Sequence, residues 1–276
     1  MATWLITGCS TGLGRALATA VLARGECAVV TARSAAGVQA LAQRYPDTAL
    51  ALALDVTDAD QVAAAVRLGE ERFGRVDVLV NNAGYGYRAA VEEGDEADVA
   101  RLFATNFFGP VALIKAVLPG MRARRRGAIV NVSSIAARIT PPGSGYYAAT
   151  KAALEGVSGS LREELRPLGI TVMAVEPGAF RTDFAGRSLA QSDEAIADYA
   201  DTAGRRRKEH DTTNGTQQGD PTKAAEAIIT ALRSPEPPGL LLLGTDAVAA
   251  AAKALDAQRA ELEVWEELAA STDYTG

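Results

Sequence analysis

A tyrosine and a lysine four positions apart, Tyr147 and Lys151, are the pair of side chains best suited to proton transfer in this sequence. Residues at this spacing share one face of a helix. An ammonium group beside a phenol favours the phenolate, so Lys151 is expected to lower the pKa of Tyr147 from about 10. Such a tyrosine could exchange a proton with a carbonyl or alcohol oxygen near neutral pH.

Two positions offer adjacent residues of the same type, so the one suited to catalysis must be chosen. Tyr146 precedes Tyr147, but the residue four positions after it is Thr150, which carries no charge to stabilise a phenolate. We therefore assign acid–base chemistry to Tyr147 and expect Tyr146 either to line a pocket or to pack. Ser133 and Ser134 end a predicted strand, where successive side chains face opposite sides.

The composition excludes several other kinds of active site. The 276 residues include 1 His, 2 Cys and 3 Met, so an HExxH protease motif and a His-rich metal site are impossible. Cys9, Cys27 and His210 share no ligand spacing, and we predict that no metal is bound. His210 lies in a polar run and is expected to be solvated.

The two cysteines are expected to remain free thiols. Cys9 follows the first predicted strand and Cys27 begins the second. On parallel strands they would lie roughly 15 Å apart at about 3.3 Å per residue, which is beyond disulfide reach. Two cysteines in a chain of this length favour a reducing compartment, and we expect a cytoplasmic protein.

Charge and hydropathy argue against nucleic-acid and membrane partners. The formal net charge is −6 and the pI is near 5.0, whereas nucleic-acid binding favours a basic chain. Two basic clusters, at 122–126 and 205–208, are expected to be solvated faces. No targeting segment is evident, and Asp246 and Lys253 interrupt the apolar stretch Gly239–Leu255, so we expect no membrane span.

Seven apolar runs alternate with segments of helical periodicity, and these elements must position the chemistry. The runs predicted as strands are Thr3–Thr7, Ala28–Thr31, Ala49–Asp55, Val76–Asn81, Ala128–Ser133, Thr171–Glu176 and Leu240–Leu243. Strands that are apolar on both faces and alternate with helices predict a parallel sheet covered on both sides. We therefore predict an α/β fold, a doubly wound and mainly parallel seven-stranded sheet, in a single domain spanning 1–276.

The polar stretch 184–220 interrupts this alternation. It is too long for an ordinary connection, and insertions of this length are usually lids or binding loops. We predict a substrate-binding lid, with a disordered segment without function as the alternative.

A glycine-rich turn follows the first predicted strand and reads Thr7-Gly8-Cys9-Ser10-Thr11-Gly12-Leu13-Gly14, with a helix directly after it. Glycines let a backbone approach a pyrophosphate closely, and a helix N-terminus offers N–H groups and a positive dipole end. We therefore predict a dinucleotide site there. Its contacts would come from Gly8, Ser10, Thr11, Gly12 and Leu13.

The end of the second predicted strand indicates which dinucleotide is bound. An acidic residue there would bind the ribose 2′-hydroxyl of NAD and repel a 2′-phosphate. This sequence has no carboxylate at that point, and Arg33 follows Ala32 directly. Because a guanidinium suits a phosphate by charge and by its forked geometry, we predict NADP(H) over NAD(H), with a surface role for Arg33 as the alternative.

Taken together, these motifs resemble the short-chain dehydrogenase/reductase family. The matching motifs, in family order and spacing, are Gly8-x-x-x-Gly12-x-Gly14, Asn81-Asn82-Ala83-Gly84, Asn106, Ser134, Tyr147-x-x-x-Lys151 and Pro177-Gly178. The resemblance covers nearly the whole chain. Within the family, the segments at 3–10 and 176–182 resemble the 17β-hydroxysteroid and retinol dehydrogenase-like branch.

The resemblance implies a Rossmann-type doubly wound fold with helices on both faces, a CH–OH oxidoreductase, and roles for particular residues. Family spacing selects Ser134 as the hydroxyl that binds the substrate oxygen, makes Asn106 part of a proton relay, and places Lys151 on the nicotinamide ribose. Further cofactor contacts are implied for Asp55, Val56, Asn82, Ala83, Gly84, Tyr147, Pro177, Gly178 and Thr182. Lys151 and a cationic nicotinamide ring would together lower the pKa of Tyr147. Family members usually pair through the helices after strands four and five, which implies a homodimer or homotetramer.

Asn106 carries a feature of this chain's own. Pro110 lacks an N–H group, so it cannot bond the carbonyl of Asn106 four residues earlier in a helix. A carbonyl freed in this way could hold an ordered water. We therefore expect Pro110 to reinforce the relay, with a simple packing kink as the alternative.

Apolar and aromatic side chains are expected to line the substrate site under the lid. Besides Ser134, the predicted contacts are Tyr85, Ile135, Tyr146, Phe180 and Phe184, with Tyr87 and Ile139 nearby. This lining favours a bulky, hydrophobic alcohol or ketone, and Arg88 and Arg138 could admit an acidic group. The rival functions are a non-enzymatic NADP(H)-sensing protein, an NAD-dependent dehydrogenase of the same family, and a nucleotide-sugar epimerase or dehydratase, for which the chain leaves little room.

Overall fold

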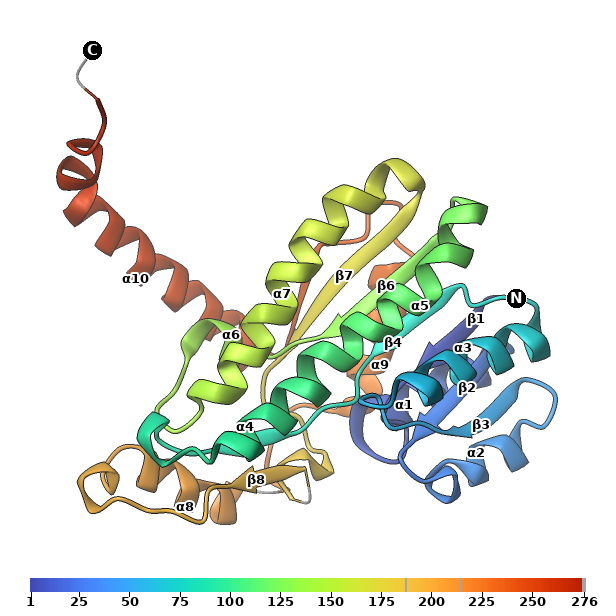
Figure 1. Ribbon diagram of the computed structural model, residues 1–276, viewed down its shortest axis with the longest axis horizontal. Helices are drawn as coiled ribbons and strands as arrows, with labels where there is room; N and C mark the ends of the chain where they lie inside the picture. Colours follow the sequence, from blue (N-terminus) through green and yellow to red (C-terminus); the bar gives the residue numbers. More distant parts are fainter. Residues whose placement is uncertain (187, 214, 275–276) are drawn as a thin grey trace.

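A seven-stranded parallel sheet forms the centre of the molecule in the computed structural model, which describes residues 1–186, 188–213 and 215–274 (Figure 1). The strands are Thr3–Ile6 (β1), Cys27–Ala32 (β2), Ala49–Ala53 (β3), Val78–Asn81 (β4), Gly127–Val132 (β6), Ile170–Pro177 (β7) and Leu240–Leu243 (β9). Their spatial order is β3-β2-β1-β4-β6-β7-β9, and every neighbouring pair is parallel. The predicted doubly wound fold is confirmed, and its strand order reverses between β1 and β4.

Helices cover both faces of the sheet, and each face has its own apolar core. The first face carries α1 (Gly12–Ala23), α2 (Gln39–Arg44) and α9 (Pro221–Leu232). The second carries α3 (Ala59–Phe73), α5 (Gly109–Arg124) and α7 (Gly145–Leu165). Alternate residues of β1 enter different cores, because successive strand side chains point to opposite faces.

The segment that includes α5 is long and apolar. Residues 96–124 form a continuous helical stretch of α4 (Glu96–Phe103), a π-helical turn (Ala104–Phe108) and α5. Its length, and a mean hydropathy of 1.5 in its most apolar 18-residue window, would suffice to cross a membrane by those criteria alone. In this fold α5 buries Leu113, Val117 and Met121 against the sheet, which is typical of a core helix.

A second, small sheet was not predicted from the sequence. It joins β5 (Gly86–Arg88) to β8 (Leu189–Gln191) in parallel. The stretch 184–220 therefore contains β8 and the helix α8 (Ala203–Thr213), and β8 attaches the stretch to a segment that follows β4. The role of this stretch as a substrate-binding lid stays a prediction.

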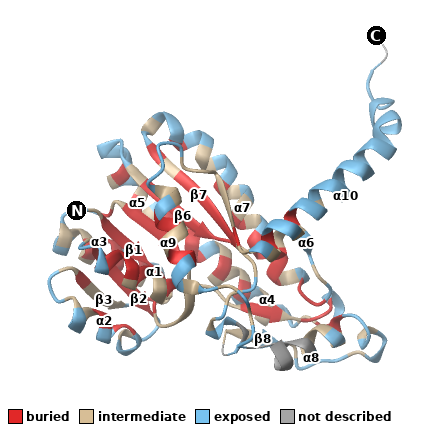
Figure 2. Cartoon of the chain, turned by 180° about the vertical axis from the view of Figure 1, so that it is seen from behind, coloured by how far each residue is buried: buried red, intermediate tan, exposed pale blue. Residues whose placement is uncertain are grey.

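The last helix extends away from the sheet (Figures 1 and 2). The helix α10 (Thr245–Ala270) buries Ala247 and Ala251 in its first two turns, and its residues after Ala254 are exposed. A short helix, α6 (Ala136–Ile139), lies near the beginning of α10. Cys9 and Cys27 are free and buried, in agreement with the prediction.

Candidate active site

The glycine-rich turn lies between β1 and α1, at the edge where the strand order reverses. Gly8 and Gly12 have φ of +71° and +60°, values that side-chain-bearing residues rarely adopt. A Cβ on Gly14 would lie 2.5 Å from the carbonyl oxygen of Gly8, so α1 can approach the turn only with glycine there. This tight turn at the start of a twelve-residue helix fits the pyrophosphate of a dinucleotide.

Asn82 holds this turn in place. Its Nδ2 donates to the carbonyl oxygens of Thr7 at 2.8 Å and Gly8 at 3.2 Å. In return, the Thr7 hydroxyl accepts hydrogen bonds from the backbone N–H groups of Asn82 and Ala83, both at 2.9 Å. The Asn82-Ala83-Gly84 segment thus braces the strands β1 and β4 against each other.

Tyr147 lies in the first turn of α7, buried and hydrogen-bonded to Ser134. Burial raises the pKa of Tyr147, while the hydrogen bond with Ser134 and the charge of Arg88 oppose that rise. We predicted that Lys151 lowers the pKa of Tyr147, but the protein's own side chains leave this pKa above its ordinary value. The reason is that the loss of hydration on burial outweighs the charges near the phenol.

Lys151 lies one helical turn after Tyr147, as predicted. Its Nζ donates to the carbonyl oxygen of Val132 at 2.8 Å and lies 5.8 Å from the centroid of the Tyr147 ring. Burial lowers the pKa of Lys151 to about 8, and the charge of Glu155 opposes this shift. Lys151 is thus an ammonium at neutral pH that can lose its proton in mildly alkaline solution.

Asn106, the fourth residue predicted to be catalytic, lies beside Gly84. The side chain of Asn106 is fully buried, donates to the Tyr85 carbonyl at 2.9 Å and to the Thr150 hydroxyl at 3.2 Å, and accepts from the Tyr85 N–H at 3.1 Å. A Cβ on Gly84 would lie 3.0 Å from Asn106 Oδ1 and 3.5 Å from Lys151 Nζ. Gly84 therefore lets the chain pass between the asparagine and the lysine.

The backbone around Asn106 differs from the regular helix that was expected. Residues Ala104–Phe108 form a π-helical turn, and Pro110 follows in the first turn of α5. Single π-helical turns within longer helices are frequent at functional sites. The role predicted for Pro110 stays a prediction.

The residues predicted around the adenosine part of the cofactor lie at the ends of β2 and β3. Arg33 is exposed directly after β2. The Asp55 carboxylate accepts from the N–H and hydroxyl groups of Thr57 at 2.9 and 2.7 Å, and Val56 is buried. Their contacts with a cofactor stay predictions.

The loop after β7 brings a further acidic residue to the site. The carboxylate of Asp246, in the first turn of α10, accepts from the Ala179 N–H at 2.7 Å, and a Cβ on Gly178 would lie 2.4 Å from it. Across the same loop, a Cβ on Gly12 would lie 3.3 Å from Thr182 Cβ. The glycine-rich turn and the loop at 177–182 therefore face each other. Sequence reasoning missed Asp246 because its contact is 67 residues away in the chain.

The predicted substrate contacts separate into two groups. The ring of Phe184 lies 5.8 Å from that of Tyr147, and Tyr85 is held at the site by its backbone bonds to Asn106. Ile135 is half-buried beside Ser134. In contrast, Tyr146 packs 6.2 Å from the ring of Tyr87 and donates to the carbonyl of Val91.

Phe180 and Arg138 also have structural partners. Phe180 packs against the core that contains α1 and α9, close to Gly219. Arg138 binds the buried carboxylate of Glu176, which makes it unsuited to receive an acidic substrate group. Arg88 does lie near the site, and its side chain is hydrogen-bonded to Ser144 just before α7.

The stretch 184–220 is attached to the body through a buried ion pair. Arg207 of α8 contacts the carboxylate of Glu93, which also accepts from the N–H groups of Ala90 and Ile196. Burial raises the pKa of Glu93, but these hydrogen bonds and the charge of Arg207 outweigh it, so the net shift is downward. The side chain of His210 lies outside the described residues.

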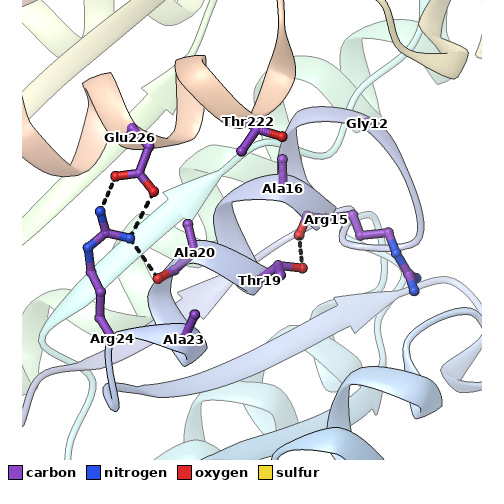
Figure 3. A pocket seen from close by; sticks show the side chains of 9 residues that line it. All are labelled: Gly12, Arg15, Ala16, Thr19, Ala20, Ala23, Arg24, Thr222 and Glu226. Atoms are coloured by element: carbon purple, nitrogen blue, oxygen red, sulfur yellow. Dashed lines mark hydrogen bonds and ion pairs between the residues drawn. The ribbon is translucent and has the colours of Figure 1, made fainter.

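Two other candidate sites can be set aside. Within the described ranges, no three His, Cys, Asp or Glu side chains gather to hold a metal ion. A surface cavity of about 490 Å³ lies between α1 and α9, crossed by the ion pair of Arg24 and Glu226 (Figure 3). Of the predicted cofactor residues its lining includes Gly12 alone, so it is not the catalytic site.

Comparison with known proteins agrees with this geometry. The short chain dehydrogenase family model matches residues 2–193. The oxidoreductase BOA17 of Botryotinia fuckeliana is 40% identical over 96% of this chain and 97% of its own length. A 3-ketodihydrosphingosine reductase of Bacteroides thetaiotaomicron is 38% identical over 85% of this chain and 84% of its own.

Solved structures show the same architecture over almost the whole chain. A short-chain dehydrogenase from Streptomyces avermitilis has a TM-score of 0.93 and 44% identity, covering 99% of this chain and 98% of that one. A Burkholderia phymatum enzyme in complex with NAD has a TM-score of 0.82 at 22% identity, covering 93% and 95%. An alcohol dehydrogenase from Thermococcus sibiricus complexed with 5-hydroxy-NADP has a TM-score of 0.71 at 26% identity, covering 88% and 95%. The chain belongs to the short-chain dehydrogenase/reductase family of oxidoreductases.

Proposed function

We propose that this protein is an NADP(H)-dependent oxidoreductase that interconverts a secondary alcohol and a ketone on a bulky, hydrophobic substrate. The observation that carries the proposal is the arrangement around Tyr147. Its buried phenol is hydrogen-bonded to Ser134, the Lys151 ammonium lies 5.8 Å from its ring, and Asn106 is fixed beside Lys151. This arrangement supplies a proton donor and a second hydroxyl for one substrate oxygen.

The residues at the edge of the sheet fit a nicotinamide dinucleotide, which would supply the hydride. The turn from Gly8 to Gly14 and the N-terminus of α1 would bind the pyrophosphate, Lys151 the nicotinamide ribose, and Thr182 the carboxamide. In the reductive direction the Tyr147 hydroxyl donates its proton to the carbonyl oxygen, and the Ser134 hydroxyl donates a hydrogen bond to the same atom. A phenol with its ordinary pKa of about 10 already holds this proton at neutral pH, and burial raises the pKa of Tyr147 further.

The preference for NADP(H) rests on the end of β2. Arg33 is exposed there, and no carboxylate in the segment 31–34 would repel a 2′-phosphate. Among the related structures, one was solved with NAD and one with 5-hydroxy-NADP, so both classes of cofactor occur on this fold.

The substrate class is proposed from the side chains beside Tyr147. Phe184 presents aromatic surface there, which favours a hydrophobic ketone. One relative is a reductase whose name specifies a keto substrate, 3-ketodihydrosphingosine. In this proposal, 184–220 acts as a lid that carries Phe184, and the protein works in the cytoplasm as a homodimer or homotetramer.

Cofactor oxidation tests the proposal directly. NADPH and NADH are compared as donors across aldehydes, steroid-like ketones and keto-esters, with Arg33→Ala beside the wild type. We expect turnover of hydrophobic ketones with NADPH, and an Arg33→Ala variant that loses NADPH preference while retaining activity with NADH. A clear preference of the wild type for NADH would refute the role of Arg33, and binding of NADPH without turnover of any carbonyl would favour a cofactor-sensing protein.

A further inference from the structure

A polar cluster that the reaction does not use directly lies beside the catalytic residues. Arg138 Nε donates to both oxygens of Glu176, at 2.9 and 2.7 Å, and Arg138 Nη2 lies 3.9 Å from Glu155 Oε2. The hydroxyl of Ser133 donates to Glu155 Oε1, and the carboxyl groups of Glu155 and Glu176 are close enough for a hydrogen bond to form between them when one is protonated. The Glu176 side chain is fully buried, and that of Glu155 is 19% exposed.

Each member of the cluster lies next to a residue of the active site. Arg138 is in α6, which begins directly after the Ser134 loop, and Glu155 is one helical turn after Lys151 in α7. Glu176 immediately precedes the Pro177-Gly178 loop. The cluster therefore joins the serine loop, the tyrosine–lysine helix and the expected nicotinamide loop.

The charges in this cluster do not balance if both carboxyl groups are ionised. Two carboxylates would then share one guanidinium, and a hydrogen bond between two carboxyl groups needs a proton on one of them. Burial raises the pKa of Glu155 to about 7, the Glu176 charge acts in the same direction, and Ser133 and Arg138 oppose it. The charged or titratable groups that face Glu155 are Arg138 from α6, Glu176 from β7 and Lys151 from its own helix, with the Ser133 hydroxyl after β6.

The charge of Glu155 also acts on the catalytic lysine. Burial favours the neutral amine of Lys151, and the negative charge of Glu155 favours its ammonium form. An ionised Glu155 therefore helps to keep the proton on Lys151, whereas a neutral Glu155 does not.

We propose that Glu155 and Glu176 share one proton, and that Glu155 is a positioning residue whose ionisation keeps Lys151 in its ammonium form as the solution becomes alkaline. When the shared proton leaves to solvent, the negative charge that it neutralised faces Lys151. The pair thus extends to higher pH the range in which Lys151 is protonated and the site is active. The inference rests on the proposed function for its kinetic readout alone.

The Glu155→Gln variant is the isosteric test, because glutamine keeps the acceptor for Ser133 and gives Glu176 a permanent N–H donor. The matched control is Glu164→Gln, an exposed residue further along the same helix. Glu176→Gln instead places the permanent N–H donor at position 176, facing Glu155. This variant is used if Glu155→Gln does not fold.

Thermal unfolding of the isolated protein from pH 5 to pH 8 is the first readout. A carboxyl group with a folded pKa above its unfolded value of about 4.3 loses its stabilising contribution as pH rises through the folded value. We expect the wild type to lose stability relative to Glu155→Gln across this range, and to keep a constant difference from Glu164→Gln. An equal pH dependence in wild type and Glu155→Gln would overturn the shared proton.

The second readout is kcat/KM against pH for reduction of ethyl benzoylformate with NADPH. We expect the alkaline decline of Glu155→Gln to move to lower pH by about one unit, with activity at pH 6 close to that of wild type. An unmoved alkaline decline, or an equal loss at every pH, would overturn the link to Lys151. If the wild type reduces no carbonyl compound, the proposed function fails, and the unfolding measurement still decides whether the proton is shared.

Discussion

Among single residues, Gly84 shows how closely the backbone must pass between two side chains of the site. A Cβ at this position would lie 3.0 Å from Asn106 Oδ1 and 3.5 Å from Lys151 Nζ. The side chain of Asn106 is held by three hydrogen bonds and has little freedom to move away. The added methyl group must therefore displace Lys151 or the turn itself.

For Gly84→Ala we expect kcat to fall by about tenfold or more, because small misplacements of catalytic groups have large kinetic effects. Steady-state kinetics with NADPH and a ketone measure this change in kcat. The matched control is Gly156→Ala in α7, where a Cβ meets nothing within 4 Å. That change should leave kcat unaltered and stabilise the helix by up to about 1 kcal/mol. Equal kinetics for Gly84→Ala and wild type would contradict this placement of Gly84.

The pKa of Lys151 predicts the alkaline limit of the enzyme. Because burial lowers this pKa to about 8, the side chain is an ammonium below that pH and loses its charge above it. We expect kcat/KM for ketone reduction to be level near neutral pH and to decline above about pH 8. A pH–rate profile checks this, and a profile that stays level to pH 10 would show that the lysine keeps its proton.

At the scale of elements, the attachment of 184–220 depends on contacts between distant segments. The strand β8 pairs with β5, and Arg207 of α8 forms an ion pair with Glu93, with the two side chains 13% and 2% exposed. Breaking one partner of such a buried pair leaves an uncompensated charge, which typically costs about 3–5 kcal/mol. Here the loss would destabilise the attachment of residues 184–220 and leave the central sheet folded.

We therefore expect Arg207→Met to speed limited proteolysis within 184–220 and to raise KM for the ketone, with the sheet still folded. The downward pKa shift of Glu93 means that the contribution of this carboxylate is present above its unfolded pKa of about 4.3 and is lost as pH falls through the lower folded value. Arg166→Met is the control, because Arg166 and its partner Glu163 are both exposed. Unchanged proteolysis of Arg207→Met would refute this view of the attachment.

The contrast between predicted and unpredicted elements has a physical basis. The seven strands of the large sheet carry a local signal, namely apolar runs, and their prediction was confirmed. The glycine spacing of the turn at Gly8–Gly14 is also a local signal, and this turn lies between β1 and α1 as expected, while its cofactor contacts stay predictions. The strands β5 and β8 are three residues each and pair across about a hundred positions, so they leave no local pattern. Glu155 and Glu176 lie on different elements, and nothing in the spacing of the sequence indicates that they meet.

At the scale of the whole molecule, α10 divides into a packed beginning and an exposed remainder. Asp246 bonds to the loop after β7, and Ala247 and Ala251 are buried. Further along, Leu262 and Trp265 are 65% and 57% exposed. The beginning of the helix therefore supports the active site, and the remainder adds little to the core of a single chain.

We expect the protein shortened to residues 1–257 to unfold within about 1 kcal/mol of the full chain, because exposed residues contribute little to stability. Urea denaturation measures the difference in the free energy of unfolding between the shortened and the full chain. By comparison, Asp246→Ala in the full chain should weaken NADPH binding. A much larger loss on shortening would show that the exposed side chains are covered in solution, as in a homo-oligomer.

The central claim is that Tyr147 transfers the proton, and Tyr147→Phe tests it most directly because it removes the hydroxyl and leaves the ring against Phe184. The measurement is single-turnover reduction of a ketone by NADPH, with NADPH binding determined on the same samples. We predict a rate lower by about 10² to 10⁴ and NADPH binding close to that of wild type. A Tyr147→Phe enzyme that reduces the ketone within tenfold of wild type would contradict the account.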